Sequence, residues 1–152
     1  MGEEAGKAVV DTYALMAMVF GELGDQARRV MLDIYEGRVR GLVPSTVGYE
    51  FALQWLRGKV PGLSSLDEVQ VFLGAYFEVV DLGLGDFVEI ARIKFAGDEM
   101  LASSGDGELT SRRLSLVDSS VILVGARYSA PIVTGDRGLS YVAEKMGLRV
   151  LW

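Results

Sequence analysis

Acidic residues stand at several points in the sequence where a carboxylate could do chemistry. Asp11 and Asp136 each follow a short apolar run that is typical of a buried strand. Asp118 opens an apolar stretch typical of a buried helix, and Glu50 lies at the border of a helical apolar stripe. Carboxylate oxygens are the hard ligands that Mg²⁺ and Mn²⁺ prefer. Because the chain contains no histidine and no cysteine, a carboxylate metal site is the chemistry that these residues suit best.

Each of these acids also has a plain structural interpretation. The spacing from Ser115 to Asp118 is that of a capping box, and Asp136 next to glycine is typical of a turn. Glu50 lies about 60° around the helix from Val47, where a glutamate is ordinarily solvated. The functional interpretation therefore depends on whether the four side chains converge.

Composition limits the class of protein. The chain has 152 residues, half of them hydrophobic and 24% charged, which predicts one globular domain spanning residues 1–152. A net charge of −6 argues against coating nucleic acid through bulk charge. The acidic start at residues 1–4 has no signal-peptide pattern, and no apolar run approaches the roughly 18 residues of a membrane span. We therefore expect a cytoplasmic protein.

Apolar runs and helical spacings alternate along the chain. This alternation predicts an α/β fold, a three-layer α/β/α sandwich whose sheet is mainly parallel. The predicted strands cover residues 7–10, 38–43, 77–82, 132–134 and 148–152. The predicted helices cover residues 14–20, 25–35, 45–57, 65–76, 86–96 and 139–146, with another from residue 118 that ends before Pro131.

Several local features carry separate predictions. Thr12 is the expected N-cap of the first helix, and Ser45 or Thr46 that of the third. Residues 97–114 are polar and contain three glycines, so we predict a long surface loop there. The stretch Gly83–Gly85 is not a nucleotide-binding loop, because the third glycine and a following GK[ST] motif are missing.

In an open parallel sheet, ligands bind beyond the carboxyl ends of the strands. Asp11 and Asp136 follow two predicted strands. Asp118 and Glu50 lie in early turns of helices that return from the sheet, so all four can face one crevice. Carboxylates that hold paired metal ions support phosphodiester cleavage.

The sequence resembles the PIN-domain ribonucleases, and most of all the VapC-like toxins of prokaryotic toxin–antitoxin pairs. The resemblance covers nearly the whole chain and lies in four short motifs: Val9-Val-Asp-Thr12, Pro44-Ser-Thr46 with Glu50, Leu116-Val-Asp118, and Ile132-Val-Thr-Gly-Asp136. It implies a Mg²⁺- or Mn²⁺-dependent endoribonuclease in which Asp11, Glu50, Asp118 and Asp136 are catalytic and hold the metal. The hydroxyls of Thr12 and Thr134 match supporting positions, and a protein antitoxin is the implied partner.

The chain departs from the family pattern at two places. The segment before Asp118 is longer than usual, and Gly138 stands where many members have another acid. An acidic crevice also needs cations to accept RNA. Arg112, Arg113 and Arg137 are candidates for phosphate contact, with plain surface charge as the alternative for each.

Two other functions fit parts of the pattern. A haloacid dehalogenase-like phosphohydrolase also has an aspartate after its first strand, but it requires a second one two residues later, where Tyr13 stands. A PIN-fold binding protein without catalysis would keep the fold and lose turnover. We also predict a homodimer that buries part of the first helix, whose apolar residues are Leu15, Met16, Met18, Val19 and Phe20.

Overall fold

The computed structural model describes residues 6–152. A five-stranded, all-parallel sheet with strand order β3-β2-β1-β4-β5 forms the centre of the molecule. The register pairs Val9 with both Leu42 and Ile132, so β1 is the middle strand. The strands are β1 (Gly6–Val10), β2 (Val39–Pro44), β3 (Glu78–Val80), β4 (Ile132–Val133) and β5 (Val150–Leu151).

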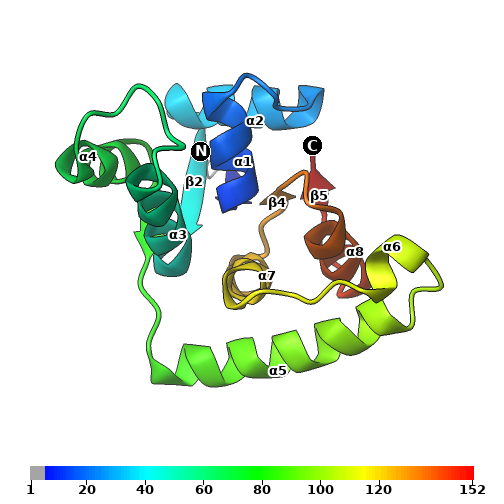
Figure 1. Ribbon diagram of the computed structural model, residues 1–152. Helices are drawn as coiled ribbons and strands as arrows, with labels where there is room; N and C mark the ends of the chain where they lie inside the picture. The colour runs from blue at the N-terminus through cyan, green and yellow to red at the C-terminus, as the bar shows by residue number, and fades with distance from the viewer. Residues whose placement is uncertain (1–5) are drawn as a thin grey trace, which may run out of the picture.

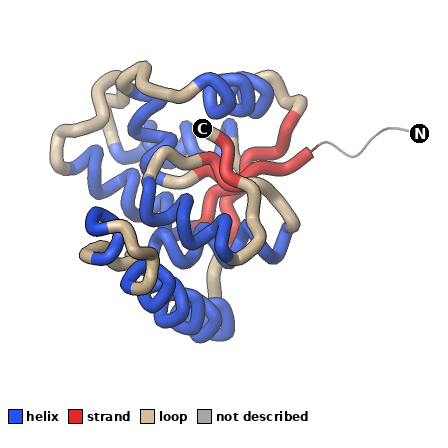
Figure 2. Tube along the Cα trace, turned by 90° about the vertical axis from the view of Figure 1, so that its right-hand side faces the viewer, coloured by secondary structure: helices blue, strands red, loops and turns tan. Residues whose placement is uncertain are grey.

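Helices cover both faces of this sheet, which confirms the predicted α/β/α sandwich. In Figure 1, α2 lies on one side of the strands and α7 on the other, and α5 runs beneath α7 and α8, against which it packs. Figure 2 shows the strands enclosed by these helices. The helices are α1 (Thr12–Val19), α2 (Asp25–Tyr35), α3 (Ser45–Leu56), α4 (Leu66–Tyr76), α5 (Leu84–Ala102), α6 (Gly107–Thr110), α7 (Leu116–Tyr128) and α8 (Arg137–Lys145).

The predicted loop at residues 97–114 is wrong in its first part. Helix α5 continues through Gly97 to Ala102, and the short helix α6 follows. A Cβ on Gly97 would lie 2.3 Å from Leu114 Cδ1, so the glycine serves the close approach of two segments. Leu101, Leu109 and Leu114 are buried, which anchors this region to the core.

Three predicted helix starts are also corrected. The N-cap of α1 is Asp11 rather than Thr12, since the Asp11 side chain accepts from the Ala14 N–H. The N-cap of α3 is Pro44, so Ser45 and Thr46 are already helical. Asp86 lies in the first turn of α5 and accepts from the Gly83 N–H, so α5 starts two residues earlier than predicted.

The neighbouring strands β1 and β4 run through the core. Val9, Val10, Ile132 and Val133 are fully buried, as continuous β-branched runs in a parallel sheet require. Residues 6–152 contain no helix that is long and apolar enough to cross a membrane. The acidic start at residues 1–4 lies outside the described residues.

Candidate metal centre

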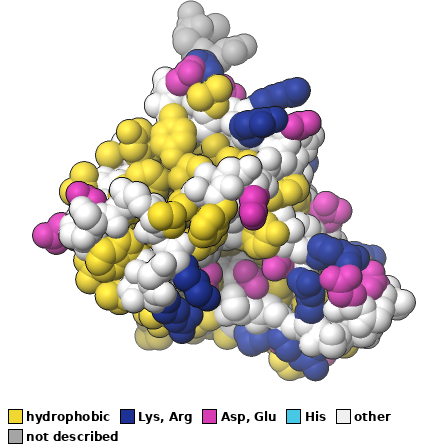
Figure 3. Space-filling view, turned by 45° about the horizontal axis from the view of Figure 1, so that its top comes forward, with side chains coloured by type: hydrophobic (Ala, Val, Ile, Leu, Met, Phe, Trp, Pro, Cys, Tyr) yellow, Lys and Arg dark blue, Asp and Glu magenta, His cyan; other side chains and the backbone are white. Residues whose placement is uncertain are grey.

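One pocket collects the four acids that the sequence singles out. It has a volume of about 390 Å³ and lies at the carboxyl ends of β1 and β4, where Asp11, Glu50, Asp118 and Asp136 all line it. Figure 3 shows acidic side chains at a hollow in this face of the molecule, with a broad hydrophobic area above it and basic side chains to its left and right. The sheet topology thus brings together residues up to 125 positions apart (136 − 11).

Asp11 is the most deeply placed of the four. The residue is only 3% exposed; Oδ1 accepts from the Ala14 N–H at 2.8 Å, and Oδ2 accepts from the Thr134 hydroxyl at 2.5 Å. Burial raises the pKa of Asp11 to about 7, and the negative charges of Asp118 and Asp136 raise it as well, against the lowering effect of the two hydrogen bonds. Asp11 is therefore a carboxyl that lacks a compensating positive charge.

Asp118 joins the same electrostatic group from the first turn of α7. The predicted capping box exists: Ser115 Oγ accepts from the Asp118 N–H at 2.9 Å, and Asp118 Oδ2 accepts from the Ser115 N–H at 3.2 Å. Burial is again the main cause that raises the pKa, here to about 6, and the charges of Asp136 and Glu50 add to it. The Asp118 side chain thus both caps α7 and lines the pocket.

Asp136 is the N-cap of α8, where Oδ1 accepts from the Leu139 N–H at 2.8 Å. Thr134 connects it to Asp11, because the Thr134 hydroxyl accepts from the Asp136 N–H at 3.1 Å while donating to Asp11. Glu50 reaches the pocket from α3 and is only partly buried.

Thr12 also lines the pocket. Its hydroxyl is the one buried side-chain polar atom in residues 6–152 without a hydrogen-bond partner. An orphaned oxygen beside four carboxylates is a further potential contact for a metal ion or its water ligands.

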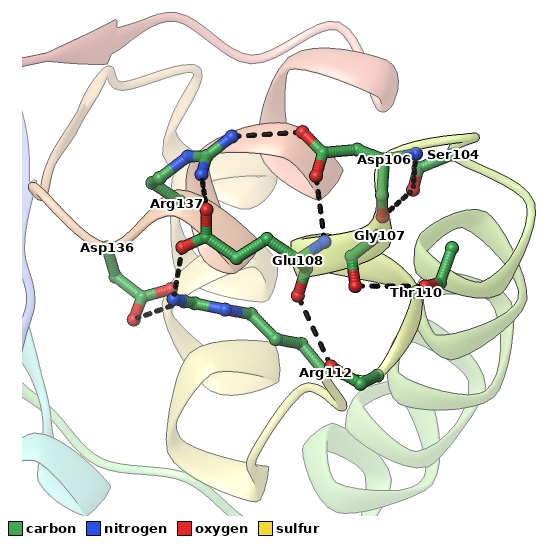
Figure 4. Close-up of polar contacts among 9 residues, drawn as sticks. Ser104, Asp106, Gly107, Glu108, Thr110, Arg112, Asp136 and Arg137 are labelled. Atoms are coloured by element: carbon green, nitrogen blue, oxygen red, sulfur yellow. Dashed lines mark hydrogen bonds and ion pairs between the residues drawn. The ribbon is translucent and has the colours of Figure 1, made fainter.

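The arginines near this pocket differ in their surroundings. Figure 4 shows Arg112 directed at Asp136, with Nη1 3.7 Å from Asp136 Oδ2. Arg112 also pairs with Glu108, at 3.2 Å. Arg137 points the other way, toward Asp106 and Glu108. Arg112 and Arg113 line a smaller adjoining pocket together with Asp118 and Asp136, so these two arginines, and not Arg137, border the acids.

The donor chemistry of the pocket fits Mg²⁺ or Mn²⁺. All the charged side chains that line it are carboxylates, since Glu22 lies there beside the four acids, and hydroxyl oxygens adjoin them. The chain has no histidine or cysteine to compete as a metal ligand. Within residues 6–152, no three acidic side chains already stand in position to enclose an ion. A bound ion would therefore draw these mutually repelling carboxylates together.

The sequence pattern did not identify the apolar wall of the pocket as part of a site. Tyr13 and Met16 of α1 line it together with Phe20, the C-cap of that helix, and Gln54. The spacing of Tyr13, Met16 and Phe20 is that of one helical face, and this spacing is the signal that the sequence offered. Leu15, which was expected to contribute to a dimer surface, is instead fully buried in the core.

Comparison with known proteins supports the fold. No family model matches the chain, and no curated protein matches it. PAE2754 from Pyrobaculum aerophilum is similar in structure, with a TM-score of 0.60 and 18% identity over 99% of this chain and 87% of that one. VapBC2 from Rickettsia felis, bound to a DNA fragment from its promoter, has a TM-score of 0.57 and 13% identity over 95% of this chain and 96% of that one. FitAcB from Neisseria gonorrhoeae has a TM-score of 0.50 and 13% identity over 94% of this chain and 95% of that one. The chain has the fold of the VapC-like PIN-domain toxins.

Proposed function

We propose that the protein is a Mg²⁺- or Mn²⁺-dependent endoribonuclease and the toxin of a toxin–antitoxin pair. One observation carries this proposal: four carboxylates from separate segments line a single pocket on a VapC-like fold, and two of them have raised pKa values. Clustered acids with perturbed pKa values are typical of functional sites.

The residues in and beside the pocket have different proposed roles. Asp11, Glu50, Asp118 and Asp136 would hold the metal through their oxygens, and Thr134 orients Asp11 by its hydrogen bond. When bound, the ion would lower the pKa of a water molecule and neutralise charge on the phosphate. Arg112 and Arg113 stand beside the acids, where they can contact a backbone phosphate. In-line attack by water leaves 5′-phosphate and 3′-hydroxyl ends.

We infer a protein antitoxin as the partner of this chain, in the cytoplasm. The likeness of its fold to VapBC2 and FitAcB supports this inference. Its test is co-expression with the product of the neighbouring reading frame, followed by co-purification and measurement of inhibition. We also keep the homodimer as a proposal, now based on Phe20, which is 53% exposed at the C-terminal end of α1. A monomer mass in light scattering at tens of micromolar protein would contradict it.

RNA cleavage with and without metal tests the main proposal. We expect cleavage with Mg²⁺ or Mn²⁺, none in EDTA, and loss of cleavage in Asp11→Asn and Asp118→Asn. Metal-independent cleavage, or a 2′,3′-cyclic phosphate end, would overturn the mechanism, because that end signals attack by the RNA's own hydroxyl. RNA binding without any turnover would favour a PIN-fold binding protein instead.

A further inference from the structure

Helix α1 gives the acidic pocket an aromatic wall. Tyr13 stands two residues after Asp11 and lines the pocket with the four carboxylates. Its side chain is 49% exposed. An exposed aromatic ring beside a group of carboxylates has no role in holding a metal, so its presence there needs another explanation.

The ring of Tyr13 is held in place from below. It packs edge-on against Trp152, with ring centroids 5.5 Å apart and planes at 72°. Both rings lie close to Gly135, where a Cβ would stand 2.7 Å from Tyr13 Cε1 and 2.6 Å from Trp152 Cζ2. The backbone of Trp152 is itself fixed, since its carbonyl accepts from the Gln26 N–H at 3.2 Å. Any side chain at position 135 would displace this arrangement.

Tyr13 therefore lies close to both Asp11 and Asp136 along the chain or through a neighbouring residue. It follows Asp11 by two residues, and it rests on the residue that immediately precedes Asp136. A phosphate bound through the metal ion that these carboxylates would hold would lie in the pocket that Tyr13 lines, with its adjoining base near the ring. A fixed ring loses little conformational freedom when a ligand stacks on it, which favours binding.

We propose that Tyr13 is a base-stacking residue, which receives the base of the unpaired nucleotide next to the scissile phosphodiester bond. This inference rests on the proposed ribonuclease function. A flat, half-exposed ring matches the flat face of a base, which is free only where the RNA is single-stranded. Stacking of this kind orients the nucleotide while tolerating different bases, since every base has such a face.

The test uses four proteins and a short single-stranded RNA that is cut at one bond. The proteins are the wild type, Tyr13→Phe, Tyr13→Leu and the control Tyr76→Leu. Tyr76 is a matched control because it is 45% exposed and packs edge-on against another ring, that of Tyr35, but lines a different pocket. We expect Tyr13→Leu to lower kcat/KM by roughly tenfold, whereas Tyr76→Leu keeps the wild-type value. Tyr13→Phe, which restores a stacking ring, should recover most of the loss seen in Tyr13→Leu.

Two further RNAs, each abasic at one of the two nucleotides that flank the cut, identify the base that stacks on the ring. On one of them kcat/KM of the wild type should fall roughly tenfold, and on that RNA the wild type and Tyr13→Leu should have equal kcat/KM. This arm needs no variant for the wild-type loss, so it remains informative if Tyr13→Leu folds poorly. Anisotropy of labelled RNA, measured with Ca²⁺ in place of Mg²⁺, should show the same order in Kd.

The outcomes separate the two proposals. If the wild type cleaves the RNA but Tyr13→Leu cleaves it as fast, or loses as much on the abasic RNA, the stacking role is wrong and the ribonuclease function stands. If Tyr13→Leu weakens only the binding of a partner protein, the wall is a protein-docking surface and the stacking role is again wrong. If the wild type cleaves no RNA, both proposals fail.

Discussion

The Thr134 hydroxyl donates to Asp11 Oδ2 at 2.5 Å, and this hydrogen bond joins the residues that follow β1 and β4. Both side chains are buried. Thr134 partly offsets the effect of burial on Asp11, since this hydrogen bond lowers a pKa that burial raises. Thr134 therefore affects how readily Asp11 loses its proton.

Replacement of Thr134 by valine removes this donor at nearly constant volume. The pKa of Asp11 should rise further, so metal must compete with a more tightly held proton. The expected result is a higher Mn²⁺ concentration for half-maximal cleavage, together with a loss of stability of about 1–3 kcal/mol. Thr134→Ser, which keeps the hydroxyl, is the control. An unchanged Mn²⁺ requirement in Thr134→Val would contradict the role.

Removal of a charge from the pocket should stabilise the metal-free protein. Folding raises the pKa of Asp11 from 3.8 to about 7 and that of Asp118 to about 6. The native state thus holds these protons more tightly than the unfolded chain does. Stability falls as pH rises between about 4 and 7, on the order of 1.4 kcal/mol per pKa unit and group. In EDTA at pH 8, Asp11→Asn and Asp118→Asn should melt above the wild type, and their advantage should shrink at pH 5.

Asp98→Asn provides a control of opposite sign. Burial tends to raise the pKa of Asp98, but Lys94 and the Leu114 N–H lower it overall, so its charge is stabilising. This variant should melt below the wild type. Mn²⁺ should raise the melting temperature of the wild type most, since a ligand at a hundredfold excess over Kd adds roughly 2.7 kcal/mol. If Asp11→Asn and Asp118→Asn melt lower in EDTA, and Mn²⁺ stabilises no protein, the metal site is wrong.

Arg112→Gln should change metal binding and RNA binding in opposite directions. The side chain lies 3.7 Å from Asp136 and neutralises part of the acidic pocket, so its removal should tighten Mn²⁺ binding. It should also raise KM for RNA and reduce the salt dependence of binding by about one ion. Mn²⁺ titration and RNA binding at several salt concentrations measure both effects. Arg127→Gln is the control, because Arg127 pairs with Asp86 outside the pocket; equal behaviour of the two variants would exclude a phosphate contact by Arg112.

Gly97→Ala tests the ordered segment that precedes α7. The new Cβ would stand 2.3 Å from Leu114 Cδ1 and 3.1 Å from Val142 Cγ1, so we expect destabilisation of roughly 1–3 kcal/mol in urea unfolding. Gly85→Ala in the same helix meets nothing within 4 Å and should stabilise by less than about 1 kcal/mol through helix propensity. Equal effects of the two substitutions would mean that α5 does not pack on Leu114.

The sequence alone determined the order of strands and helices, apart from α6. Patterns such as Lys7–Val10 and Asp25–Tyr35 are local, since side chains alternate in strands and recur every three to four residues in helices. The four acids could also be named in advance, because Asp11 and Asp136 follow strands, Asp118 lies in the first turn of a helix, and Glu50 belongs to a motif that resembles the PIN-domain pattern. Their meeting in one crevice follows from a parallel sheet, whose carboxyl ends lie at one edge.

Only the tertiary structure decided the features that depend on distant neighbours. Gly97 looks like a helix breaker in the sequence, yet it lies inside α5 because Leu114 needs the space that a side chain would fill. The ring of Tyr13, which lines the pocket, packs against Trp152 and close to Gly135, both more than 100 residues away in the chain. The pKa of Asp11 depends on burial and on charges more than 100 residues away in the chain (118 − 11 = 107). Packing and electrostatics act through space, so neither can be obtained from the local pattern that sets helices and strands.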